Sequence, residues 1–360
     1  KLIEILEDNN IQIWTEHGKL KYKAPMGVLS NEILTALKEN KSELIQYLDD
    51  NTIEMEEDSK HRFLPFPLTD VQSAYLLGRT DVFEYGNTAC HIYIEIKYPE
   101  LKLQKVQEIW NRLINKHEML RAIIKTDGYQ QILERVPQFV VEMNFDDNDD
   151  IALSRIREKM SHSIYNTEQW PLFELAITKT KEGDILHLSM DFLIADWTSI
   201  WRLILEFEQL YFYGNSEINP QIGVSFRDYV IAERKKTKTA SYMKDKAYWM
   251  KRIDNFYSAP KLPKIDQNNE SNPVRFLRKS LQLSKEEWKV FKEKAKKKGI
   301  TSTTLLLCCY ALCIERWSEN KKFSLNLTVL NRLPIHNDID KVVGDFTSIN
   351  LLEINLEERQ

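Results

Sequence analysis

Glycine is scarce in this 360-residue sequence, and its ten glycines are scattered singly. The chain therefore lacks G-x-G-x-x-G and G-x-x-x-x-G-K-[ST], the glycine-rich loops that cradle nucleotide phosphates. It also lacks G-x-S-x-G and H-E-x-x-H, the motifs of serine hydrolases and zinc peptidases. These absences argue against a nucleotide cofactor and against a hydrolase triad.

Cysteine is also rare, with four residues at positions 90, 308, 309 and 313. Their spacing suits neither a zinc site nor a disulfide framework, so we expect no metal and a reducing compartment. No apolar run reaches the roughly 18 residues of a membrane span, and the first residues lack the basic-then-apolar order of a signal peptide. The sequence thus predicts a cytoplasmic protein with no membrane partner.

Neither sign of charge dominates, because 50 Lys and Arg face 54 Asp and Glu for a net charge of -4. Such a balance gives no overall field for nucleic acid. The lysine run at 292–298 could suggest an RNA-binding face, but Trp288 and Phe291 give its helix an apolar side. A solvated helix face is the preferred interpretation, and we expect no nucleic-acid partner.

Residues 1–48 show the pattern of a small αββαα domain. A short helix at Leu2–Leu6 precedes two alternating segments around the turn His17-Gly18. Two helices follow, the first capped by Ser30. Residues 49–60 hold six acids and one Lys with little apolar content, which predicts an acidic linker.

Beyond Phe63, strands alternate with amphipathic helices, which predicts an α/β (α+β) domain. We expect a first lobe over 61–222 and a second over 223–360. In the second lobe, Ser284 and Glu287 form a capping box, Gly299 ends that helix, and a buried helix follows from about Thr303 to Trp317. Strands are expected at 323–331 and 347–354.

Several motifs in this region resemble those of one protein family. FPLTDVQSAYLLGR (66–79) meets every fixed position of the opening motif of nonribosomal heterocyclisation domains. WNRLINKHEMLRAII (110–124) resembles the second motif, with Lys116 in place of its first Arg. MSHSIYNTEQWPLFEL, VSFRDYV, LNRLP and VVGDFTSINLL then follow in the expected order.

The hexapeptide DFLIAD (191–196) indicates the subclass. Ordinary condensation domains have H-H-x-x-x-D-G in this loop, whereas heterocyclisation domains have D-x-x-x-x-D. Asp191 takes the first His position, Phe192 takes the second, and Asp196 keeps the final Asp. A Phe can neither accept nor donate a proton, so the imidazole of the amide-forming relatives is absent.

The resemblance makes Asp191, Asp196 and Asn331 the candidate catalytic residues. Asp191 either shapes the substrate tunnel or touches the substrate. Asp196 is either catalytic or structural, and the structural role is either an N-cap or a pair with an Arg such as Arg121 or Arg332 that holds the two lobes together.

Two further positions have open alternatives. Asn331 resembles a family position implicated in ring formation, and the alternative is a turn-initiating Asn. Thr347 is expected to be a buried strand residue rather than a proton donor. A Thr and an Asp that are better placed for cyclodehydration in the family lie in motifs beyond the G-D-F-T motif.

Residues 1–48 resemble the tubulysin-synthetase type of N-terminal docking domain. In that family the hairpin edge accepts the C-terminal tail of the preceding synthetase as an added strand. Lys19, Lys21 and Lys23 project from one face of the second strand and suit an acidic tail. The alternative is that these lysines only protect the edge from aggregation.

The resemblance implies a chloramphenicol-acetyltransferase-like fold of two lobes. It also implies carrier proteins upstream and downstream, each with a phosphopantetheine arm, a downstream adenylation domain, and no cofactor bound directly. The amine of carrier-bound Cys, Ser or Thr would attack an upstream thioester, and its side chain would then close a thiazoline or oxazoline ring.

Two other functions stay open at this point. One is an amide-only condensation acyltransferase. The other is a docking and carrier-binding module without ring-closing activity, because we expect both ends of the chain to be truncated and the second lobe to be incomplete.

Overall fold

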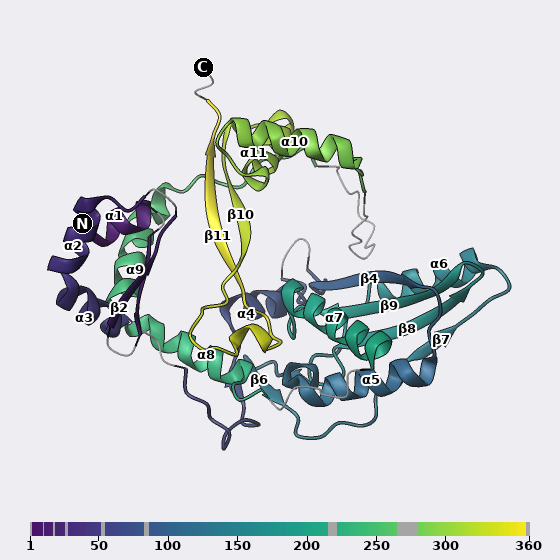
Figure 1. The fold of residues 1–360 in the computed structure, drawn as a ribbon. Helices are drawn as coiled ribbons and strands as arrows, with labels where there is room; N and C mark the ends of the chain where they lie inside the picture. The colour runs from purple at the N-terminus through teal and green to yellow at the C-terminus, as the bar shows by residue number, and fades with distance from the viewer. Residues whose placement is uncertain are drawn as a thin grey trace. The chain divides into compact units, whose positions relative to one another are not determined.

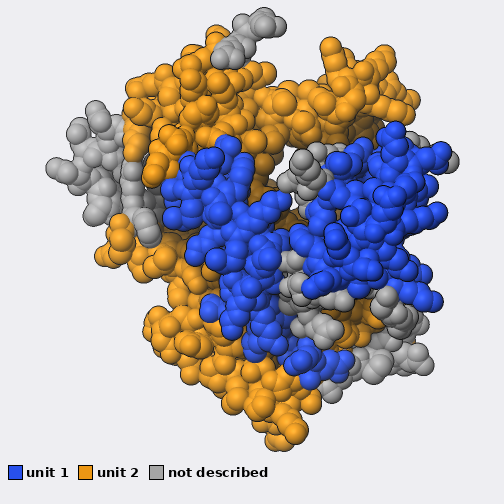
Figure 2. Space-filling view, turned by 90° about the vertical axis from the view of Figure 1, so that its left-hand side faces the viewer, with its two compact units in different colours: residues 1–57, 228–253 blue, residues 58–227, 254–360 orange. Residues whose placement is uncertain are grey.

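The computed structural model describes residues 2–9, 11–16, 19–25, 28–51, 55–82, 86–214, 222–264 and 279–357. The chain divides into two compact units, residues 1–57 with 228–253 and residues 58–227 with 254–360 (Figure 2). Residues 228–253, which the sequence analysis assigned to the second lobe, group with the first unit through contacts between α3 and α9. The predicted turn at His17-Gly18 lies outside the described residues.

The first unit has the predicted αββαα order. Its elements are α1 (Leu2–Asp8), β1 (Gln12–Glu16), β2 (Lys19–Lys23), α2 (Asn31–Glu39) and α3 (Lys41–Asn51), joined by α9 (Ala240–Arg252). β1 and β2 form an antiparallel hairpin. The predicted cap is confirmed, because the Ser30 hydroxyl accepts the N–H of Ile33 at 3.2 Å. Leu6, Ile11, Leu37 and Leu44 form a small buried core.

The first part of the second unit is built on a four-stranded sheet of order β4-β9-β8-β7, with only β7 and β8 parallel (Figure 1). A smaller antiparallel sheet has the order β3-β6-β5. The elements are β3 (Phe66–Pro67), α4 (Asp70–Leu77), β4 (His91–Tyr98), α5 (Leu103–Lys116), η1 (Glu118–Arg121), β5 (Ala122–Ile124), β6 (Tyr129–Ile132), β7 (Glu142–Asn144), α6 (Asp149–Met160), β8 (Phe173–Thr180), β9 (Gly183–Asp191) and α7 (Trp197–Tyr213).

Helices cover both faces of the larger sheet. On one face Trp110 of α5 and Phe207 of α7 stack with their ring centroids 6.1 Å apart, and Phe173 of β8 lies beneath them. On the other face Ile156 and Met160 of α6 pack against the sheet. The predicted mixed α/β architecture is confirmed. The end of β9 and the start of α7 lie at the same end of the larger sheet.

The remaining elements are α8 (Phe226–Lys235), η2 (Lys236–Lys238), η3 (Ile253–Asn255), α10 (Lys285–Lys297), α11 (Ser302–Trp317), β10 (Lys322–Leu330), η4 (Ile339–Lys341) and β11 (Thr347–Asn355). The two predicted strands are present as β10 and β11, and they pair into a long antiparallel ribbon (Figure 1). The capping box of Ser284 and Glu287 is present, and Gly299 follows α10 at a φ of 70°, a conformation that favours glycine.

The prediction that α11 is a buried helix is wrong in this structure. Only Ala311 and Glu315 are buried, whereas Leu306, Tyr310 and Trp317 are exposed. The physical reason is that, among the residues described, α10 is the element that packs closely on α11, so one apolar side stays uncovered. Within the same residues, no helix has both the length and the apolar content that crossing a bilayer requires.

Candidate active site

The DFLIAD segment is the predicted strand-to-helix loop. Asp191 is the last residue of β9, and Asp196 is the N-cap of α7. The Oδ1 atom of Asp191 accepts the N–H of Leu193 at 3.0 Å, and its backbone carbonyl accepts the N–H of Ile194 at 3.2 Å. Both carboxylates are buried, with exposed fractions of 0% and 3%. The loop is therefore tightly folded, and its two acids face inward.

Asp191 forms a buried ion pair with Arg79, the final residue of the FPLTDVQSAYLLGR motif. Arg79 also donates to the carbonyl oxygen of Tyr165 at 3.1 Å. Burial raises the pKa of Asp191, while the guanidinium of Arg79 and the N–H of Leu193 oppose that shift. A carboxylate that is fully shielded from water is costly unless an opposite charge accompanies it, and Arg79 of the first motif provides that charge.

The carboxylate of Asp196 accepts two backbone hydrogen bonds. Its Oδ1 atom accepts the N–H of Ser199 at 2.7 Å, and its Oδ2 atom accepts the N–H of Phe346 at 3.2 Å. The nearest guanidinium nitrogen of Arg332 lies 3.6 Å from Oδ2. Of the two arginines that the sequence suggested, Arg332 is the neighbour, because Arg121 donates to backbone carbonyls instead.

Arg332 connects the LNR and VVGDFT motifs to the DFLIAD loop. It donates to the carbonyl oxygens of Ile339 and Val342 at 2.8 and 2.7 Å, and to the hydroxyl of Ser199 at 3.0 Å. Its guanidinium carbon lies 3.7 Å from the centre of the Phe346 ring. Burial lowers the pKa of Arg332, and the nearby carboxylate of Asp196 opposes that shift.

Gly344 allows the segment before β11 to pack closely against the DFLIAD loop. Its carbonyl oxygen accepts the N–H of Asp196 at 2.9 Å and the hydroxyl of Ser199 at 2.9 Å. A Cβ atom at this position would lie 2.2 Å from the ring of Phe226, which is too close for any real contact. Glycine is therefore required here for packing.

Asn331 lies directly after β10, beside the segment that packs against the DFLIAD loop. Its backbone N–H donates to the carbonyl oxygen of Phe346 at 2.7 Å, and the N–H of Phe346 in turn donates to Asp196. The structure thus brings all three predicted catalytic residues to one place, the junction between the DFLIAD loop and the segments that flank β10 and β11.

Lys19, Lys21 and Lys23 belong to the other unit, where they are exposed on alternate positions of β2.

The sequence analysis missed the most unusual acid of this junction, Asp345. Its side chain has an exposed fraction of 0%, and burial raises its pKa to about 7. Its Oδ1 atom accepts the N–H of Thr347 at 3.1 Å, whereas Oδ2 has no hydrogen-bond partner among the described residues. Asp345 lies in the G-D-F-T motif, whose presence in the sequence indicated a resemblance to a family but did not indicate a role for this acid.

Tyr75 and Cys90 are two further residues that the sequence did not single out. Burial raises the pKa of Tyr75, whose hydroxyl lies near the side chains of Thr347 and Cys90. Burial also raises the pKa of the Cys90 thiol, to about 11. Thr347, predicted to be a buried strand residue, is the first residue of β11 and is only half-buried. Each of these groups keeps its proton at neutral pH.

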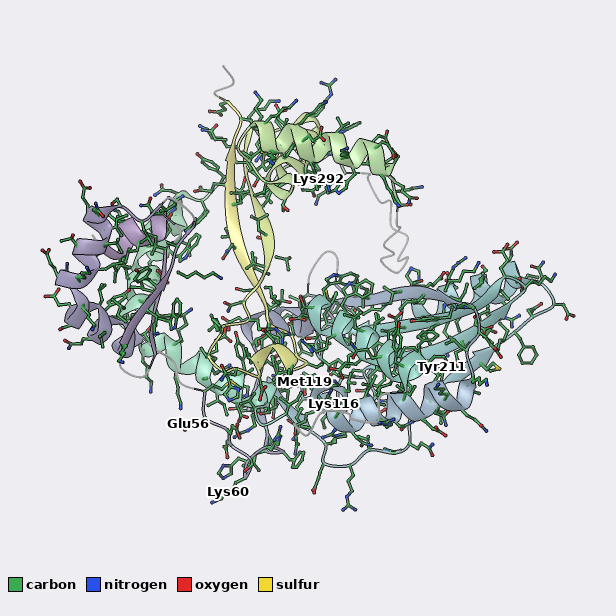
Figure 3. All side chains as sticks on the ribbon, in the orientation of Figure 1. Glu56, Lys60, Lys116, Met119, Tyr211 and Lys292 are labelled. Atoms are coloured by element: carbon green, nitrogen blue, oxygen red, sulfur yellow. The ribbon has the colours of Figure 1, made fainter. Side chains whose placement is uncertain are left out.

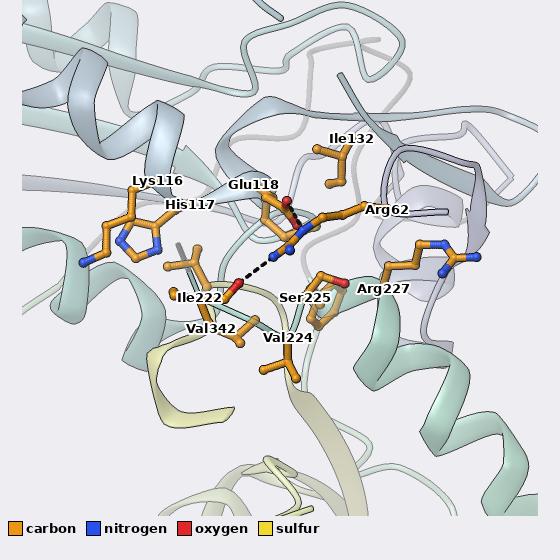
Figure 4. Close-up of a pocket in the computed structure, with 13 residues that line it drawn as sticks. Arg62, Lys116, His117, Glu118, Ile132, Ile222, Val224, Ser225, Arg227 and Val342 are labelled. Atoms are coloured by element: carbon orange, nitrogen blue, oxygen red, sulfur yellow. Dashed lines mark hydrogen bonds and ion pairs between the residues drawn. The ribbon is translucent and has the colours of Figure 1, made fainter. Parts of the chain in front are cut away.

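The second motif has a structural role around a separate small cavity of about 20 Å³ (Figure 4). Arg62 donates to the carbonyl oxygen of Ile222 at 2.7 Å and forms an ion pair with Glu118. Lys116 and Met119 also line it, near the end of α5 (Figure 3). The volume suits one water molecule, and none of the predicted catalytic residues lines it.

Metal-binding chemistry has no support in the described ranges, where no three His, Cys, Asp or Glu side chains are grouped to hold an ion. The site is therefore made of three buried acids, nearby hydroxyl groups and the aromatic side chains of Phe192, Tyr75 and Phe346. Phe192 lies at the position where condensation relatives have their second His, and its ring centroid is 6.4 Å from that of Tyr75.

Comparison with protein families now identifies this architecture. The Condensation domain family model matches residues 66–360, and the TubC N-terminal docking domain model matches residues 1–50. The chain belongs to the condensation-domain family and begins with a docking domain of the TubC type.

Several known proteins resemble the chain over most or all of its length. The pyochelin synthetase PchF of Pseudomonas aeruginosa PAO1 is 31% identical over 99% of this chain, which spans 20% of PchF. The phenyloxazoline synthase MbtB of Mycobacterium sp. (strain MCS) is 30% identical over 82% of this chain, which matches 25% of MbtB. The EpoB NRPS cyclization-docking bidomain from Sorangium cellulosum aligns with a TM-score of 0.82 and 28% identity, over 100% of this chain and 73% of that one.

Proposed function

We propose that this chain is the docking and heterocyclisation portion of a nonribosomal peptide synthetase. It condenses an upstream carrier-bound acyl or aminoacyl thioester with carrier-bound Cys, Ser or Thr, and then cyclodehydrates the product to a thiazoline or oxazoline. The chain spans about a fifth of PchF, and the similarity to PchF, to a phenyloxazoline synthase and to the cyclization-docking bidomain supports this activity.

The chemistry of the DFLIAD loop is the observation on which the proposal depends. Phe192 replaces the imidazole of amide-forming relatives, and Asp191 and Asp196 are each held by buried partners. Amide formation does not require a base here, because a tethered amine and thioester react at a very high effective concentration. In this proposal Asp191 and Asp196 shape the reaction chamber, and the side chain of Asn331 contributes to ring formation.

The domain organisation follows from the same proposal. Residues 1–48 form the docking domain, 49–60 the acidic linker, 61–222 the first lobe of the heterocyclisation domain, and 223–360 its second lobe. The protein works in the cytoplasm as a carrier-dependent acyltransferase and cyclodehydratase. Phosphopantetheine arms of an upstream and a downstream carrier deliver both substrates, and an adenylation domain downstream loads the second carrier.

The docking domain recruits the C-terminal tail of the preceding synthetase. β2 pairs with β1 on one side, and contacts with α3 hold the hairpin within its unit. An extended acidic tail would add to the hairpin as a further strand, and Lys19, Lys21 and Lys23 would meet its carboxylates.

Product mass tests the proposed function directly. The chain, produced together with any native sequence that follows Gln360, is mixed with one carrier loaded with an acyl group and another loaded with Cys. A carrier-bound product lighter than the linear amide by one water supports heterocyclisation. The linear amide alone supports amide-only condensation, and binding of the carriers without any new product supports a docking and carrier-binding module.

A further inference from the structure

The first motif holds the DFLIAD loop through side chains of α4 and of the residue that follows it. Gln72 and Tyr75 are three residues apart, so they lie on the same side of α4, and Arg79 comes just after its end. The ring centroid of Tyr75 lies 6.4 Å from that of Phe192, and Arg79 forms the buried ion pair with the first Asp of the loop. Gln72 contacts the loop backbone, because its Nε2 atom donates to the carbonyl oxygen of Leu193 at 2.6 Å.

The side-chain amide of Gln72 is completely buried, with an exposed fraction of 0%, and its hydrogen-bonding capacity is fully used. Its Oε1 atom accepts the N–H of Thr69 at 2.9 Å and the Nε2 group of Gln130 at 2.8 Å. Its Nε2 atom donates to the Oε1 atom of Gln130 at 3.0 Å as well as to Leu193. Because a backbone donor faces the oxygen and a backbone acceptor faces the nitrogen, the amide has one favourable orientation.

Gln130 supports this amide from the smaller sheet. It belongs to β6, has an exposed fraction of 0%, and donates from Nε2 to the carbonyl oxygen of Pro67 at 3.1 Å as well as to Gln72. The partners of its side chain, Gln72 and Pro67, both lie outside the DFLIAD loop. A buried polar pair is rigid when each of its groups is satisfied, so the two amides form a firm base from which Gln72 reaches the loop.

The bond from Gln72 orients the part of the loop that carries Phe192. The carboxylate of Asp191 accepts the N–H of Leu193, and the carbonyl of Asp191 accepts the N–H of Ile194, so Asp191 and Gln72 together fix the peptide between Leu193 and Ile194. Five of the six side chains in the hexapeptide are buried, whereas that of Phe192 is half-buried. Phe192 is therefore the side chain that the loop presents outward.

We propose that Gln72 is a positioning residue for ring closure, which acts through the carbonyl of Leu193 to hold Phe192 against the condensed product. This inference rests on the proposed function and adds to it the residue that sets the geometry of the loop. Gln72 itself touches no substrate and exchanges no proton. Phe192, at the position of the second His in amide-forming relatives, forms the wall that keeps the product in the conformation from which its thiol or hydroxyl attacks.

The two reaction steps differ in how strongly they depend on this geometry. A thioester is an activated acyl group, and a tethered amine reaches it at a high effective concentration, so amide formation tolerates a small displacement of the loop. The amide carbon that must be attacked next is a much weaker electrophile, so ring closure depends more on exact placement. Since a misplacement of about 1 Å can slow a reaction by about 100-fold, losing the bond from Gln72 should affect ring closure selectively.

The variants Gln72→Met and Gln130→Met separate positioning from general support. Each replaces one amide of the buried pair with an apolar side chain of similar length, so both should lower the free energy of unfolding. In Gln130→Met the amide of Gln72 keeps its bonds to Thr69 and Leu193, whereas Gln72→Met removes the donor to the loop. We expect the ratio of cyclised to linear product to fall about 10- to 100-fold in Gln72→Met and to stay within about twofold of the wild type in Gln130→Met. Product masses measure the ratio, with any native sequence after Gln360 included and with circular dichroism to show that each variant is folded.

Gln72→Glu supplies a readout that lost stability alone would not produce. A glutamate keeps the oxygen that accepts the N–H of Thr69, and its second oxygen can donate to Leu193 only when it is protonated. Burial favours the protonated form of a carboxyl, so the donor should return as pH falls from 8 to 6. We expect the product ratio of Gln72→Glu, relative to the wild type at the same pH, to recover over this range, while that of Gln72→Met stays low.

Equal product ratios in folded Gln72→Met and Gln130→Met would overturn the inference. If Gln72→Met does not fold, Gln72→Glu carries the test, and a ratio relative to the wild type that does not change with pH overturns the inference in the same way. A wild type that forms only linear amide overturns the proposed function instead.

Discussion

The carboxylate of Asp196 accepts a hydrogen bond from the N–H of Phe346, 150 residues further along the chain. The other oxygen of the same carboxylate caps α7 through the N–H of Ser199. One side chain therefore both starts a helix and fastens the segment before β11 to it. This arrangement explains why the final Asp of the hexapeptide has a structural role even where it touches no substrate.

We expect Asp196→Ala to lower the free energy of unfolding by about 3 kcal/mol, because both the cap and a charge-assisted hydrogen bond are lost. Asp196→Asn should lose less, since an asparagine still caps a helix well. Chemical denaturation measures both values, and the exposed Asp340→Ala serves as the control. Equal stability of Asp196→Ala and the wild type would show that the contact with Phe346 contributes little.

The pair formed by Arg79 and Asp191 predicts a second stability effect. Arg79→Met leaves a buried carboxylate without its cation and should cost about 3–5 kcal/mol. The double variant Arg79→Met, Asp191→Asn should recover most of that loss, because the neutral amide has nearly the shape of the carboxylate, needs no cation, and can still accept the N–H of Leu193. Recovery of stability without recovery of product formation would assign Asp191 a direct role at the substrate.

Local sequence signals were enough to predict much of this fold. Ser30, Ser284 and Glu287 cap helices where the sequence placed them, and DFLIAD forms the expected loop. These features depend on neighbours a few residues away, so their chemistry is visible in the order of residues.

The parts that could not be predicted depend on distant partners. Asp345 has no unusual neighbours in the sequence, and its raised pKa results from burial and from Asp191 and Asp196, which lie about 150 residues earlier. The apolar residues of α11 suggested a buried helix, but burial requires a covering element that a helix pattern cannot supply. Tyr75 and Thr347 likewise meet only after β11 has packed beside α4.

The lysines of β2 predict a salt-dependent interaction. Changing Lys19, Lys21 and Lys23 to Glu should weaken binding of a synthetic acidic tail peptide by at least about 10-fold, since three surface ion pairs each contribute up to about 1 kcal/mol. Added salt should weaken the wild-type complex in the same direction. Lys38→Glu with Lys41→Glu, on exposed helical positions of the same unit, is the control. Equal losses in both variants would mean that net charge, rather than the strand edge, attracts the tail.

The buried acid Asp345 makes stability depend on pH in a defined direction. Its pKa rises from 3.8 in the unfolded chain to about 7 in the folded domain, so the folded state binds the proton more tightly. The stabilisation is fully present below pH 3.8 and is lost as pH rises through about 7. Asp345→Asn removes this contribution, so the difference in unfolding free energy between wild type and variant should shift in favour of the variant from pH 5 to pH 8. Urea denaturation at both pH values measures that difference, with Asp340→Asn as the control. A difference that stays constant would mean that Asp345 is already ionised at pH 5.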